Sequence, residues 1–263
     1  MYVVAVCRWG KPVEQELGEL AALLGGTAYD LRLRLMGPLP VLVDQSPDRQ
    51  AAEALLDALR RRGHGVVLCD TDEVYSSDQM IAPRKFGFEN EALVLEFKQP
   101  VRVAYEQIMV LVLGTRATAQ QTTTTKAKRK FSIGRAALSG GLMSRRKVSK
   151  HSTSYEEERE QVLYIFARGG ISPIIMTEFG LHYSSLGEFM CPSTSENFMA
   201  VVAILRERAH NAAFDDCLAG VTRKPSLVGV GGGASQRVTT SSNASELDLL
   251  AHLLVKAHIE KQL

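Results

Sequence analysis

The residues that most clearly suggest a recognition chemistry form one basic stretch in the middle of the chain. No Asp or Glu occurs between Glu106 and Glu156, and cations are concentrated from Thr125 to Lys150, with apolar residues such as Phe131 among them. Basic clusters beside apolar side chains favour anionic membrane surfaces, where each cation contributes about 1 kcal/mol. The candidate anion-binding residues are Lys126, Lys128, Arg129, Lys130, Arg135, Arg145, Arg146, Lys147 and Lys150.

Several interpretations of this stretch stay open. The same charges suit the phosphates of a nucleic acid, although Phe131 is the single aromatic residue and offers no stacking platform. A protein partner is a further alternative. The stretch could also be an exposed loop that the downstream acidic run EEERE (156–160) neutralises within the fold.

No local motif indicates catalysis, a cofactor or a metal. The segment GVGGGAS (229–235) has no Lys-Ser or Lys-Thr pair and is not followed at once by a helix pattern, so it is typical of a linker. The six histidines are scattered, and His252 and His258 would lie on different faces of a helix. No G-x-S-x-G context occurs. We therefore predict a non-enzyme without a cofactor; an enzyme with a site built from distant residues is the alternative.

Composition is that of an ordinary globular protein. The chain has 263 residues, of which 45% are hydrophobic and 23% charged, with a net charge of +2. Cys7 and Cys69 lie in apolar runs and are expected to be buried, reduced thiols. The first residues do not resemble a signal peptide, and no apolar run approaches the roughly 20 residues of a membrane span. A cytoplasmic location is the expectation.

The elements of residues 1–70 are predicted in the order βααβαβ, a small split-βαβ arrangement. The first helix follows Pro12, the second is capped by Thr27, and the third is expected to be capped by Ser46 and to stop at Gly63. The run TAYDLRLRLMGPLPVLVDQSPDRQAAEALLDALRRRGHGVVLCD resembles the C-terminal domain of the ribosomal stalk protein L7/L12. That resemblance implies the fold and not the ribosomal role, because the family's N-terminal dimerisation region and Lys-rich helices are missing.

Residues 71–84 are predicted to be a linker, and residues 85–215 a run of short antiparallel strands closed by one helix. Gly169-Gly170 is the expected hairpin turn, LHYSSL (181–186) an expected strand, and Ser193 the expected cap of the helix. This layout, with the segment VRVAYEQIMVLVLG, is similar to that of bacterial pleckstrin-homology-like (PH-like) domains. The resemblance implies a β-barrel capped by a helix, with the basic stretch 125–150 as an insertion between strands.

The end of the chain is predicted to be a flexible Gly/Ser/Thr linker at 216–245, followed by an amphipathic helix at 246–263. The helix could cover its own domains, pair with another subunit or bind a partner. The stripe expected to dock it consists of Leu247, Leu250, Ala251 and Leu254.

The sequence therefore predicts an α+β protein of two modules, resembling two-domain bacterial proteins. The expected function is that of an adaptor or scaffold that makes protein–protein contacts, with an anionic membrane surface as a possible second partner. Nucleic-acid binding through residues 126–150 is the alternative, and a homo-oligomer could form through the last helix.

Overall fold

The computed structural model describes residues 1–131, 145–220, 226–231 and 236–263; for 125–131, 145–152, 226–231 and 236–238 it describes the backbone only. The fold is mixed α+β. The chain forms two compact units, each described separately below. Unit 1 consists of Met1–Arg116, Glu160–Thr222 and Ala244–Leu263, and unit 2 of Ala117–Arg159 and Arg223–Asn243.

The first part of unit 1 has the predicted order βααβαβ. Its three strands are arranged β2-β1-β3, and both outer strands run antiparallel to β1, as in a split-βαβ unit. Thr27 caps the second helix by accepting a hydrogen bond from the Asp30 amide. The elements are β1 (Tyr2–Arg8), α1 (Val13–Leu24), α2 (Ala28–Leu35), β2 (Val41–Ser46), α3 (Arg49–Arg61) and β3 (Gly65–Asp70).

The start of α3 differs from the prediction. Asp48, not Ser46, is the cap, and it accepts a hydrogen bond from the Gln50 amide at 2.9 Å. Ser46 still belongs to β2, and its hydroxyl accepts from the Asp48 amide at 3.0 Å. Aspartate is as good a cap as serine, so local preference could not decide between them. Gly63 ends the helix as expected, with a φ of 89°.

Both faces of the first sheet are buried. Val4 and Val6 of β1 pack with α1, α2 and α3. Ala5 and Cys7, which point to the other face, pack with the C-terminal helix α6 (Ala244–Ile259). Strand β1 therefore lies between two layers of helix, which explains its uninterrupted apolar sequence.

The second part of unit 1 contains an antiparallel three-stranded sheet of β4 (Lys85–Phe88), β5 (Ala92–Glu96) and β6 (Val101–Ala104). The long strands β7 (Ile108–Phe131) and β8 (Arg145–Ala167) follow, and β9 (Ile174–Thr177) pairs antiparallel with β8. Gly169 and Gly170, both with positive φ, make the predicted turn. Helix α5 (Thr194–Arg208) begins after the predicted cap Ser193.

Three features of this part differ from the predictions. The described strands form no closed barrel. Strand β10 (Ala213–Leu218) includes residues 216–218, which were expected to belong to the linker, and it pairs in parallel with β7. Residues expected to form a strand at 181–186 instead contribute to the 3₁₀ segment η3 (Tyr183–Phe189). Parallel pairing joins residues about 100 positions apart, as in Ala213 with Val110, so no local sequence signal announces it.

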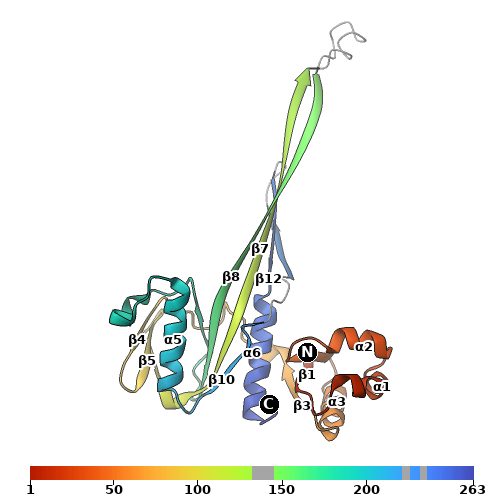
Figure 1. Ribbon diagram of the computed structural model, residues 1–263, viewed down its shortest axis with the longest axis vertical. Helices are drawn as coiled ribbons and strands as arrows, with labels where there is room; N and C mark the ends of the chain where they lie inside the picture. The colour runs from red at the N-terminus through yellow and green to blue at the C-terminus, as the bar shows by residue number, and fades with distance from the viewer. Residues whose placement is uncertain (132–144, 221–225, 232–235) are drawn as a thin grey trace. The chain divides into compact units, whose positions relative to one another are not determined.

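Helix α6 is part of the core of unit 1 and not a separate tethered element. It lies between the first sheet and the unit 1 portions of β7, β8 and β10 (Figure 1). Strand β8 shows the reason, because Leu163 and Ile165 pack against α5 and the β4–β6 sheet, whereas Val162 and Tyr164 pack on α6. An apolar surface on both sides of the helix is typical of a buried helix.

Unit 2 is a sheet in which β11 (Ser226–Gly231) and β12 (Gln236–Ser242) form an antiparallel pair, and β12 pairs with β7. The prediction of a flexible linker over 216–245 is therefore wrong for these two strands. Both paired strands are rich in β-branched residues, for example Val238 of β12 opposite Thr122 of β7, and β-branched residues favour strands. The ends of the basic stretch, 125–131 and 145–150, also belong to strands β7 and β8 and not to a loop.

Candidate functional site

An apolar groove lies in the first part of unit 1, between the β1–α1 loop and the end of α2. Its volume is about 580 Å³. The walls are formed by the loop that leads into α1, by the last turn of α2 and by the turn that leads into β2. We call this feature the groove; its lining consists of Trp9, Gly10, Lys11, Pro12, Val13, Glu14, Leu35, Met36, Gly37 and Leu39.

Beside the groove, helix α2 presents large apolar side chains to solvent. Tyr29 is 70% exposed, Leu33 71% and Met36 50%. These residues follow the i, i+4, i+7 spacing of one helix face, while Leu31 and Leu35 are buried beneath. We call Tyr29, Leu33 and Met36 the α2 stripe. Exposed apolar side chains beside a groove are a feature that many interaction sites share.

Cations border the groove and the α2 stripe. The Arg32 guanidinium lies over Met36, with Nε 3.4 Å from Sδ. Lys11 Nζ is 3.7 Å from Glu16 Oε1, and its side chain is 59% exposed. Arg34 donates to the carbonyl of Val43 and so links α2 to β2. The rim therefore combines apolar anchors with positive charge.

The β1–α1 wall of the groove is held in place by a buried histidine. His64 is 2% exposed, and its Nδ1 accepts a hydrogen bond from the Gly10 amide at 3.2 Å. Trp9 meets the imidazole edge-on, with ring centroids 5.1 Å apart. Accepting at Nδ1 requires the neutral ring, with its proton on Nε2. Burial lowers the pKa of His64, which favours that neutral form.

A buried carboxylate faces the same histidine. Glu16 Oε2 is 3.5 Å from His64 Nε2 and accepts from Arg62 Nε at 2.7 Å. The Arg62 hydrogen bond lowers the pKa of Glu16 despite the opposing effect of burial. Glu16 therefore stays ionised, and the ion pair fixes the end of α3 against α1.

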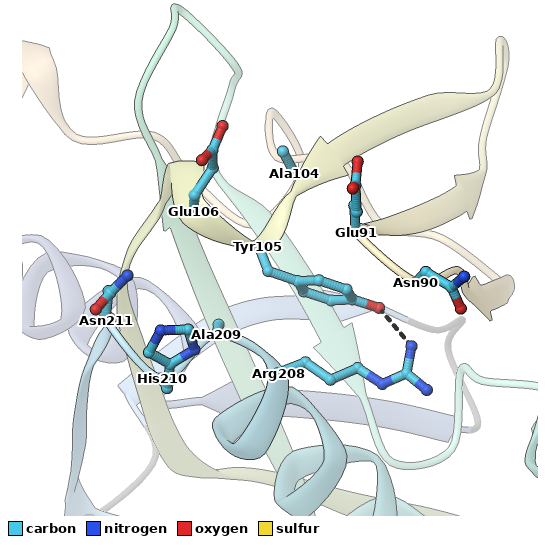
Figure 2. A pocket seen from close by; sticks show the side chains of 9 residues that line it. All are labelled: Asn90, Glu91, Ala104, Tyr105, Glu106, Arg208, Ala209, His210 and Asn211. Carbon is cyan, nitrogen blue, oxygen red and sulfur yellow. Dashed lines mark hydrogen bonds between the residues drawn. The ribbon is translucent and has the colours of Figure 1, made fainter.

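A second pocket, of about 360 Å³, lies where α5 ends near β6 (Figure 2). Arg208 points to the Tyr105 hydroxyl, which accepts a hydrogen bond from Arg208 Nη1 at 3.3 Å. The same nitrogen donates to the Glu89 carbonyl at 2.6 Å. These bonds tie α5 to the β4–β5 turn, so Arg208 acts as a structural anchor. The lining consists of Asn90, Glu91, Ala104, Tyr105, Glu106, Arg208, Ala209, His210 and Asn211.

A buried polar network surrounds Asp248, near the start of α6. Its carboxylate accepts from the Ser77 amide at 2.7 Å, the Ser77 hydroxyl at 2.6 Å and the Tyr164 hydroxyl at 2.8 Å. Arg116 donates to the Ser77 hydroxyl at 2.9 Å. Burial, with a smaller contribution from Asp248, raises the pKa of Tyr164. The network fastens α6 to residues 71–84 and to β8. The sequence indicates this network only through Asp248, an acid that lies among the apolar residues of the helix.

The predicted anion-binding residues divide between two strands. Lys126, Lys128, Arg129 and Lys130 belong to β7, and Arg145, Arg146, Lys147 and Lys150 to β8, with their side chains outside the described part of the chain. Arg135 lies outside the described residues altogether. Of the acids that could have neutralised them, Glu157 accepts from Arg159 at 2.8 Å, and Glu160 lies 3.6 Å from Arg116.

The predicted docking stripe of the last helix is buried within the chain. Leu247 and Leu254 are 1% exposed, and Leu250 and Ala251 are fully buried. They pack with residues of β1, β3 and β8, so they do not form a partner-binding surface in this structure. The sequence left self-docking open, and this alternative is the one observed. Cys7 and Cys69 are buried, free thiols as expected.

None of the helices in the described ranges is long and apolar enough to cross a membrane. Within the same ranges, no group of three or more His, Cys, Asp or Glu side chains is placed to hold a metal ion. No protein-family model matches the chain, and neither a curated protein nor a solved structure matches it.

Proposed function

We propose that the chain is a non-enzymatic, cytoplasmic adaptor that binds a protein partner in the groove and on the α2 stripe. The observation that carries the proposal is the exposure of Tyr29, Leu33 and Met36 beside an apolar groove. Leu31 and Leu35 of the same helix are buried in the core, so the three exposed side chains are not needed to fill it. Large apolar anchors next to a preformed depression are the usual components of a protein-binding hot spot.

The chemistry of the rim indicates the kind of partner. Lys11, Arg32 and Arg34 are exposed around the apolar surface, and Glu14 is the acid in the groove lining. A segment that carries one or two large apolar side chains flanked by acids would complement both features. The apolar anchors would supply affinity, and the charges would supply orientation and association rate.

A photo-crosslinking amino acid at Leu33 tests the proposal. We expect covalent adducts with a protein partner at this position and at least tenfold fewer at Asp57, an exposed control site on α3. The double substitution Leu33→Glu, Met36→Glu should weaken binding of the purified partner at least tenfold, as truncation of hot-spot residues does. Equal crosslinking at positions 33 and 57 would contradict the proposal.

A second candidate function is binding to an anionic membrane surface through the basic stretch. It is supported by the nine cations between Lys126 and Lys150. Co-sedimentation with vesicles should increase with anionic lipid and decrease with salt. The triple substitution Arg145→Glu, Arg146→Glu, Lys147→Glu should abolish it. A salt-dependent gel shift with RNA or DNA but no vesicle binding would favour nucleic acid instead.

A further inference from the structure

A second exposed apolar feature lies in unit 1, at the end of η3. Phe189 is 71% exposed and Met190 59% exposed, and the two are adjacent. We call Phe189 and Met190 the knob. Burial of two neighbouring large apolar side chains against a partner is favourable, because it removes their apolar surface from water.

The backbone under the knob is fixed by a buried asparagine. Asn197 is 4% exposed. It accepts from the Cys191 amide at 2.6 Å and donates to the Cys191 carbonyl at 2.8 Å. The Met190 amide donates to the Gly187 carbonyl at 3.2 Å, and Gly187 has a φ of 54°. A loop held at these points loses little conformational entropy when its side chains bind a partner.

Within the chain segment that carries the knob, the charged residues are acidic. Residues 169–205 contain three glutamates and neither Lys nor Arg. Two of these, Glu188 and Glu196, are exposed, and Glu188 directly precedes Phe189. The knob therefore has the chemistry of an apolar anchor flanked by negative charge, and its complement is an apolar depression bordered by cations.

The groove on the same chain has this complementary chemistry. Trp9, Pro12 and Met36 provide apolar walls, and Lys11 and Arg32 lie beside them. In one molecule the knob and the α2 stripe are both exposed, so they do not cover each other. We propose that the knob of one molecule binds the groove of a second copy of this chain. This inference rests on the proposed function, because it assigns an occupant to the same groove.

Contact between two different surfaces gives a head-to-tail assembly. Each bound pair leaves one groove and one knob unoccupied at its ends, so further copies can add unless the geometry closes a ring. The mean mass should therefore increase with protein concentration, and salt should weaken the contact by screening its charges.

Sedimentation velocity over a range of concentrations tests the inference on the full chain. The knob variant Phe189→Ser, Met190→Ser and the groove variant Leu33→Glu, Met36→Glu should each lose self-association at least tenfold. An equimolar mixture of the two should form dimers and nothing larger, because one intact knob meets one intact groove. Ile259→Ser, which removes an apolar residue that is 58% exposed elsewhere, is the control and should associate like the wild type.

Other outcomes separate this inference from the proposed function. A wild-type chain that stays monomeric, or a mixture of folded variants that gives no dimer, overturns the inference. Crosslinks at Leu33 to a different protein would then leave the proposed function standing, whereas no crosslinks at all would contradict both. Glu188→Arg, a surface change that spares folding, should weaken self-association roughly two- to fivefold. Unchanged association would show that the negative charge beside Phe189 does not contribute to binding.

Discussion

The carboxylate of Asp248 accepts three hydrogen bonds from Ser77 and Tyr164 in the interior of unit 1. Asp248→Asn keeps the shape but replaces one acceptor oxygen with a donor, so at least one buried donor loses its partner. We expect the free energy of unfolding to fall by about 2–4 kcal/mol. Tyr164→Phe removes one donor to this carboxylate and should cost less, about 1.5 kcal/mol. Urea unfolding measures both, and equal losses would contradict the network as described.

The buried imidazole of His64 makes the stability of the first part of unit 1 depend on pH. Its pKa is lowered by burial, which outweighs the opposing effect of Glu16, while Arg62 and Lys11 add to the lowering. The folded state therefore favours the neutral ring. Its contribution is complete above the unfolded pKa of about 6.5 and is lost as pH falls below that value.

We expect the wild-type chain to lose stability as pH falls below about 6.5, and His64→Gln to show a flatter profile there. Glu16 contributes at lower pH, because its lowered pKa stabilises the fold above the unfolded value of about 4.3 and the contribution is lost below it. Denaturant unfolding at each pH provides the measurement. Parallel profiles for the two proteins would show that His64 is not the titrating group.

At the scale of elements, the position of the β1–α1 loop requires a glycine at residue 10, where the backbone lies against the residue that ends α3. A Cβ on Gly10 would collide with the backbone carbonyl of Gly63. Gly10→Ala should therefore displace the groove wall and weaken partner binding several-fold while lowering stability. Gly18→Ala is the matched control: it lies in α1 with open space around it and should stabilise the chain by about 0.5–1 kcal/mol. Binding and unfolding assays on the pair distinguish a steric effect from a general glycine effect.

Local signals were sufficient for most helices and strands of unit 1. Thr27 and Ser193 cap the helices that the sequence assigned to them, and Gly169-Gly170 forms the expected turn. These features depend on neighbours within a few residues. The pairing of β10 with β7 and of β12 with β7 depends on partners about 100 or more residues away, so no local signal predicts either strand.

The candidate site was only partly predictable. The α2 stripe was present in the sequence as a second apolar face, but assigning it to solvent required knowing that Leu31 and Leu35 face the core. The continuous apolar run of β1 likewise signalled that both faces of the sheet are covered, and α6 supplies the second cover. The apolar stripe of α6 is buried within the chain itself, which is the self-docking alternative that the sequence allowed.

At the scale of the whole molecule, α6 couples the first sheet to the unit 1 portions of β7, β8 and β10 because it packs against both. We therefore expect unit 1 to unfold as one cooperative body. Fluorescence of Trp9, the single tryptophan, reports the first part, and amide exchange in β8 and β9 reports the second. Leu254→Ala, in the shared core, should lower stability by about 3 kcal/mol and move both transitions together.

Leu20→Ala is the discriminating variant, because Leu20 packs only in the core formed with α1, α2 and α3. If α6 couples the two parts, this distant change must also lower the stability reported by β8 and β9. If only the Trp9 transition moves, the first part of unit 1 unfolds independently. The packing of α6 on both parts then does not couple their unfolding. The same comparison decides whether a partner bound in the groove could stabilise the rest of unit 1, since binding to one part of a cooperative body protects all of it.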